Sequence, residues 1–140
     1  MARAAPAVAV RLPAPDAELR PAPLPLAEFA RCLYASRRLR DGLFPPGLFG
    51  EPAWDILLDL YAAEAEAKPV DVSSACVAAA VPQTTALRYV GHLEAIGLVQ
   101  RRPVASDRRR SMLHLTAIGR ATIESVLAEL CGTWWDRSRP

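Results

Sequence analysis

The sequence predicts a mainly α-helical domain of the α+β class, in which a helix-turn-helix is followed by a two-stranded β-hairpin and flanked by helices at both ends. Three observations predict it. Apolar residues recur at helical spacing through most of the chain, Val81-Pro82 separates a short helix from a longer one, and two alternating runs surround a polar turn. The 140 residues, 51% of them hydrophobic, suffice for one domain with a buried core.

The N-terminal part of the chain divides into a tail and a first helix. Residues 1–25 contain six of the 13 prolines, which predicts a disordered tail ahead of a folded domain over residues 26–140. A first helix is expected over residues 26–40, because apolar side chains recur there along one stripe. The loop over residues 43–50 is rich in Leu and Phe, and we expect it to be packed.

A second helix is expected to open at Glu51-Pro52. Proline suits the first turn of a helix, and acidic residues favour its positively polarised N-terminal end. The acids of this segment lie at spacings typical of a solvent-exposed helix surface: Asp55, Asp59, Glu64 and Glu66.

The middle of the chain predicts a helix-turn-helix over residues 71–97. Asp71 can cap a short helix over residues 72–80 by accepting a hydrogen bond from an amide of its first turn. A longer helix over residues 82–96 then ends at Gly97, a residue typical of helix C-termini.

A β-hairpin, or wing, is expected over residues 98–115. Its strands are the alternating runs 98–101 and 112–115, and the polar segment between them is the tip. Thr116 then caps a last helix that is expected over residues 116–135.

The polar residues of the longer helix and the wing suit double-stranded DNA. Six arginines and only two acids lie between Pro82 and Leu115. A helix fits the major groove, where arginine can bind guanine and glutamine can bind adenine, and arginines on a wing suit phosphates and a narrow minor groove. The expected contact residues are Gln83, Thr84, Thr85, Arg88, His92, Arg101, Arg102, Arg108, Arg109 and Arg110.

Residues 70–119 resemble the winged helix of the MarR family of bacterial transcriptional regulators. The resemblance is carried by VDVSSACVAAAVPQTTALRYVGHLEAIGLVQRR and by SDRRRSMLHLTAIG. It implies a regulator of transcription that binds DNA as a two-fold dimer. Arg88 matches the arginine of the recognition helix, and Asp107 and Arg109 match a wing pair in which the acid steadies an arginine directed at the minor groove.

The terminal helices are expected to form a homodimer. Members of that family usually close with two helices, whereas the 24 residues after Thr116 have room for one. The dimer interface is predicted from apolar residues of the first and last helices: Leu26, Phe29, Leu33, Leu127, Leu130, Trp134 and Trp135.

No pattern in the sequence supports catalysis, so we expect no enzyme activity, no cofactor and no metal site. Neither histidine lies in a metal-binding or nucleophile motif, and no glycine-rich phosphate loop is present. No apolar run reaches the length of a membrane span, and we expect a cytoplasmic protein. Cys32, Cys76 and Cys131 are expected to be buried small residues.

A different function remains open at this point. Winged helices also serve as modules that bind protein, so the alternative is a partner of the transcription machinery that does not read bases itself. The polar outer face of the helix over residues 82–96 favours DNA.

Overall fold

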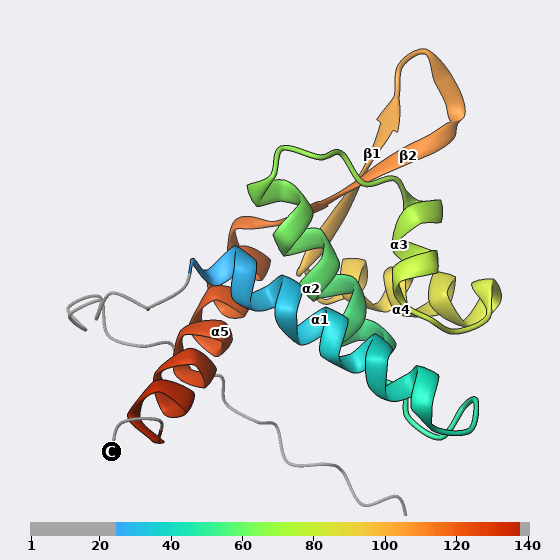
Figure 1. Ribbon diagram of the computed structural model, residues 1–140. Helices are drawn as coiled ribbons and strands as arrows, with labels where there is room; N and C mark the ends of the chain where they lie inside the picture. The colour runs from blue at the N-terminus through green and yellow to red at the C-terminus, as the bar shows by residue number, and fades with distance from the viewer. Residues whose placement is uncertain (1–24, 138–140) are drawn as a thin grey trace, which may run out of the picture.

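The computed structural model describes residues 25–137, with side chains up to residue 133. The tail predicted over residues 1–25 lies outside this part except for Pro25. The described chain forms five helices and a two-stranded antiparallel sheet in the predicted order, which confirms the predicted fold class (Figure 1). The elements are α1 (Leu26–Leu43), α2 (Pro52–Ala65), α3 (Val72–Ala78), α4 (Gln83–Ala95), β1 (Val99–Val104), β2 (Asp107–Leu115) and α5 (Ala117–Arg137).

The helix α2 lies at the centre of the fold. It packs against α1, α3, α4 and α5, while the hairpin projects from one end of the molecule and the C-terminal part of α5 extends away on the other side (Figure 1). The core is built around this helix, which contributes Ile56, Leu58 and Leu60, together with Leu113 of β2 and Leu127 of α5. Burial of these side chains is the main force that holds the elements together.

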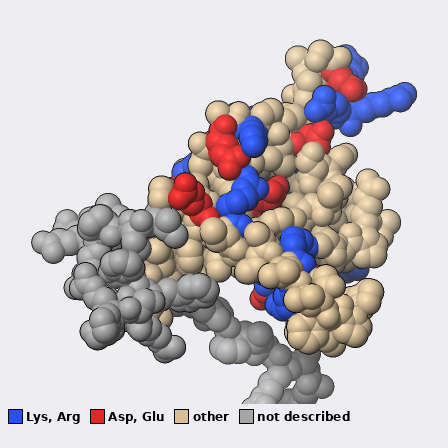
Figure 2. All heavy atoms as spheres, viewed as in Figure 1, with Lys and Arg blue, Asp and Glu red and all other residues tan. Residues whose placement is uncertain are grey.

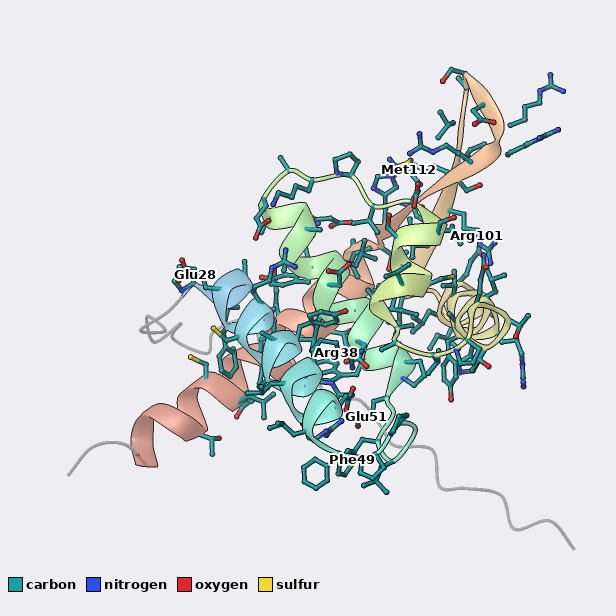
Figure 3. The ribbon with its side chains drawn as sticks, turned by 45° about the vertical axis from the view of Figure 1, so that its right-hand side comes forward. Glu28, Arg38, Phe49, Glu51, Arg101 and Met112 are labelled. Carbon is teal, nitrogen blue, oxygen red and sulfur yellow. The ribbon has the colours of Figure 1, made fainter. Side chains whose placement is uncertain are left out.

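The central place of α2 brings Asp55 into the interior, so the expectation that it lies on the helix surface is wrong. Its side chain is only 1% exposed. One carboxylate oxygen accepts a hydrogen bond from Arg37, and the other accepts one from Arg38 at 2.9 Å. Figure 3 shows Arg38 between α1 and α2. A buried carboxylate needs such partners, and they fasten α1 to α2.

The helix α1 runs three residues beyond its predicted end at residue 40. Asp41 does not end the helix, because its carboxylate pairs with Arg38 and Arg40, at nitrogen–oxygen distances of 3.0 and 3.1 Å. Pro45 and Pro46 follow the last turn, and proline cannot supply the amide that a longer helix would need.

The loop over residues 43–50 is more exposed than predicted. Leu43 is 76% exposed and Leu48 is 58% exposed. The rings of Phe44 and Phe49 meet edge to face with their centroids 5.2 Å apart, and the Arg40 guanidinium lies 4.1 Å from the centroid of Phe49. Figure 3 places Phe49 at the edge of the molecule. These contacts lie within the loop and the last turn of α1, so the loop is held by local contacts and not by burial in the core.

The helix-turn-helix has the predicted caps. An Asp71 carboxylate oxygen accepts a hydrogen bond from the Ser74 amide at 2.8 Å, and Gly97 adopts a φ of 79° after α4. The shorter helix of this motif, α3, ends at Ala78, two residues earlier than expected. Ala80 has a φ of 53°, so the turn begins before Val81-Pro82 rather than at it.

The hairpin is longer than predicted, and its tip is shorter. Residues 102–104 and 107–111, expected in the turn, belong to the strands, which leaves residues 105–106 at the tip. Polar composition suggested a loop, but the backbone groups of this segment find partners on the opposite strand. At the base, β2 is also held on its other side, because the Leu113 amide donates to the Val70 carbonyl at 2.8 Å.

One of the three cysteines departs from the prediction. Cys76 and Cys131 are buried as expected, but Cys32 is exposed. It lies two residues after the buried Ala30 in α1, about 200° further round the helix axis, and so turns away from the side on which Ala30 is buried. Burial raises the pKa of the Cys76 thiol and so lowers its thiolate fraction.

Substitution of Asp55 by asparagine should destabilise the protein far more than the same change at Asp59. Asp55→Asn removes the buried carboxylate that pairs with both arginines and leaves Arg37 only Glu51 and Arg38 only Asp41, both more exposed. This loss should lower the free energy of unfolding by about 3 kcal/mol. Asp59 pairs with the more exposed Arg31, so Asp59→Asn should cost about 1 kcal/mol or less. Urea unfolding measures both, and equal losses would contradict the importance of the buried pair.

Candidate nucleic-acid interface

The helix α4 has one buried face and one exposed face. Ala86, Val90 and Leu93 are buried at the helical spacing predicted from the sequence, and they attach the helix to the core. Figure 3 views α4 nearly along its axis, with its other side directed away from the molecule. Of the expected contact residues on this helix, four are exposed and Thr85 is half-buried; the exposed residues are Gln83, Thr84, Arg88 and His92.

The C-terminal end of α4 is fixed by the start of the hairpin. At the C-terminal end, Arg101 of β1 forms an ion pair with Glu94 at 3.0 Å. The Leu98 amide donates to the Leu93 carbonyl at 3.0 Å, which turns the chain from the helix into the hairpin. These contacts set the position of the helix relative to the wing.

Two arginines of the wing are engaged within the chain. Arg101 pairs with Glu94, as described above, and Arg110 pairs with Asp71 at 3.1 Å. The Arg110 hydrogen bond contributes to lowering the pKa of the Asp71 carboxyl, after the larger effect of its capping bonds from Ser74. Asp71 therefore links the start of α3 to the wing.

The remaining arginines of the region have no ion-pair partner among the described residues. Seven of the arginines with described side chains form ion pairs: Arg31, Arg37, Arg38, Arg40, Arg101, Arg110 and Arg120. The others are Arg88 on α4 and Arg102, Arg108 and Arg109 on the wing, and all four are exposed. Figure 2 shows arginine side chains standing out from the projecting end of the hairpin. Uncompensated positive charge is thus confined, within this part of the chain, to one helix and the wing.

Asp107 acts on the backbone of Arg109 rather than on its side chain. Its carboxylate accepts a hydrogen bond from the Arg109 amide at 3.0 Å. The Arg109 guanidinium forms no ion pair among the described residues. The acid therefore shapes the start of β2, and the guanidinium remains available to a ligand.

Apolar side chains on both flanks of α4 were missed by the sequence reasoning. Leu87 and Tyr89 are each 38% exposed, and Ile96 just beyond the helix is 54% exposed. The signal was present, because these positions fall outside the buried stripe of Ala86, Val90 and Leu93.

The base of the wing is locked to α5. Thr116 caps α5 as predicted, because its hydroxyl oxygen accepts a hydrogen bond from the Gly119 amide at 3.0 Å. The same hydroxyl donates a hydrogen bond to the Gly97 carbonyl at 2.6 Å. Only glycine fits at residue 119, because an added Cβ would lie 2.0 Å from the Leu98 carbonyl oxygen. The orientation of the wing is therefore coupled to the last helix.

Several residues expected at a dimer interface pack instead against the core of the chain itself. Phe29 and Leu127 are buried, and Leu26, Leu33 and Leu130 are half-buried against the core. The side chains of Trp134 and Trp135 lie outside the described part.

The described residues contain no group of three or more His, Cys, Asp or Glu side chains placed to hold a metal ion. In the same part of the chain, no helix combines the length and apolar character of a membrane span.

No protein-family model and no curated protein matches the sequence. Solved structures do match the fold. The heme-free form of PefR, a heme sensor from Streptococcus agalactiae, is 18% identical, with a TM-score of 0.51 over 81% of this chain and 84% of PefR. The fold is a MarR-like winged helix.

Two further structures support this description. NadR in complex with 4-hydroxyphenylacetate is 22% identical, with a TM-score of 0.51 over 79% of this chain and 70% of NadR. MepR of S. aureus in its DNA-binding conformation is 21% identical, with a TM-score of 0.50 over 80% of this chain and 77% of MepR. PefR, NadR and MepR are MarR-family transcriptional regulators, not enzymes, and the predicted likeness to that family's winged helix is confirmed.

Proposed function

We propose that this MarR-like chain is a transcriptional regulator that binds double-stranded DNA in a sequence-specific manner. The observation that carries the proposal is the distribution of arginines without ion-pair partners, which lie on α4 and the wing: Arg88, Arg102, Arg108 and Arg109. A winged helix uses these two elements against the major groove and the adjacent backbone, and phosphate attraction supplies much of the affinity.

The helix α4 would enter the major groove. Arg88 can donate two parallel hydrogen bonds to a guanine, and Gln83 can do the same with an adenine. Thr84 and Thr85 lie in the first turn of α4. The hydroxyl group of a threonine can bind a phosphate there, and its methyl group can contact the methyl group of a thymine. His92 lies further along the same exposed side.

The wing would follow the backbone and the minor groove. Arg108 and Arg109 are near the tip, where negative potential in a narrow groove attracts arginine. Arg102 lies further down β1 and would contact a phosphate. Arg101 and Arg110 would contribute less charge, because Glu94 and Asp71 already compensate them.

The regulator would act as a homodimer on a pseudo-palindromic site, in the bacterial cytoplasm where the chromosome lies. The terminal helices α1 and α5 would supply the interface, with exposed Val126 of α5 at its edge. A two-fold dimer presents two α4 helices to successive major grooves, which increases both affinity and selectivity.

A winged helix that binds protein is the second candidate. Leu87, Tyr89 and Ile96 favour it, because apolar side chains beside α4 could bury against a partner. Selection from a random duplex library with the full-length chain separates the two candidates. A regulator enriches one sequence pattern, whereas a protein-binding module enriches none.

Binding to the selected duplex should depend steeply on salt. With about four phosphates neutralised per chain, the slope of log affinity against log salt concentration should be about −4 per chain. Titrations at several salt concentrations measure it. A flat response would exclude phosphate contacts as the source of affinity.

Arg88 and the wing arginines should differ in what their removal changes. Arg88→Ala should cost about 1–3 kcal/mol on the selected duplex and relax the preference at one base pair. Arg108→Ala and Arg109→Ala should weaken selected and scrambled duplexes alike and make the salt slope shallower by about 1 each. Each variant is measured on both duplexes. Equal losses of Arg88→Ala on the two would show that α4 does not read bases.

The chain should sediment as a dimer at micromolar concentration, and Val126→Arg should shift it toward monomer. Val126 is exposed, so an added charge is tolerated in the folded chain but disfavoured at an apolar interface. Analytical ultracentrifugation measures the species. A wild-type monomer that still binds the selected duplex tightly would refute the dimer.

A further inference from the structure

Gly91 lies in the middle of α4, and no contact in the described part of the chain requires a glycine there. Its φ is not positive, so an ordinary helical backbone is formed. A Cβ added to it would meet no atom within 4 Å beyond its immediate helix backbone. Glycine is nevertheless the least favourable residue in a helix interior after proline. The chain therefore carries a helix-weakening residue that its own packing does not explain.

Other glycines of the same region are explained by the fold. Gly97 adopts a φ of 79°, a conformation that side chains disfavour. At Gly119 a Cβ would collide with the Leu98 carbonyl oxygen. Gly91 has neither reason, and no contact among the described residues accounts for a bare backbone there.

The position of Gly91 indicates what approaches it. Arg88 lies three residues before it and Ala95 four residues after it, so the three are neighbours on the helix surface. The buried residues Val90 and Leu93 face the core on the other side. The surface next to the unpaired arginine therefore carries no side chain at Gly91 and a single methyl group at Ala95.

We propose that Gly91 is the point of closest approach between α4 and duplex DNA, a position at which a side chain would hold the helix away from the groove. The inference rests on the proposed function. A helix with its side chains is about 10–12 Å wide and the major groove is about 12 Å wide, so the fit leaves little room. A bare backbone at Gly91 lets α4 enter deeply enough for the Arg88 guanidinium to reach base edges.

The test uses two full-length variants, Gly91→Ala and Gly91→Leu, and two measurements. Both residues favour a helix, so both variants should unfold about 2–4 °C higher than the wild type. Affinity for the selected duplex should fall about tenfold for Gly91→Ala and about a hundredfold for Gly91→Leu. Replacing a glycine that the fold requires would lower the unfolding temperature. A higher unfolding temperature together with weaker binding would therefore indicate that Gly91 serves DNA binding and not folding.

Gly42→Ala is the matched control. Gly42 lies in the last turn of α1, away from the apolar residues expected at the dimer interface, and a Cβ there also meets nothing within 4 Å. This variant should unfold at no lower a temperature than the wild type and should bind the duplex like the wild type.

Two results would overturn the inference. One is a Gly91→Leu variant that binds within about threefold of the wild type, and the other is a Gly91→Ala variant that unfolds at a lower temperature. Failure of the proposed function itself is distinguishable, because the wild-type chain would then enrich no duplex.

Discussion

The burial of α2 is the constraint on which the rest of the structure depends. A helix covered on nearly every side can keep acidic residues only if each is paired. Asp55 near its start is neutralised by arginines of α1. Glu64 near its end accepts a hydrogen bond from the Leu115 amide at 2.9 Å and pairs with Arg120 of α5. The two carboxylates therefore fix α1, the base of the wing and α5 to the same central helix.

Pairing of charge also decides which surface can attract a polyanion. The net charge of the chain is only +2, so its overall charge gives little attraction to DNA. Most described arginines are compensated by acids in or next to the helices, as in the pair of Arg31 with Asp59 of α2 and the pair of Arg110 with Asp71, the N-cap of α3. What remains uncompensated lies on α4 and the wing, which directs the field of a nearly neutral protein toward one side. Attraction there depends on the placement of charge more than on its amount.

The exposed side of α4 is better suited to a partner than to the stability of the free chain. Gly91 weakens the helix, and the flanking Leu87 and Tyr89 leave apolar surface in water. Binding surfaces commonly carry residues that do not optimise folding, because selection acts on function once stability is sufficient. The buried stripe opposite, formed by Ala86, Val90 and Leu93, holds the helix in place despite this cost.

The sequence by itself determined the order of the elements, the caps at Asp71 and Gly97, and which residues of α4 form its buried stripe. All of these follow from local spacing and backbone preference, which act within a few residues. Only the tertiary structure decided that Asp55 is buried, that Cys32 is exposed, and which arginines are paired. Periodicity shows which side chains share a face of a helix, but whether that face meets solvent, a core or an opposite charge depends on elements distant in the sequence.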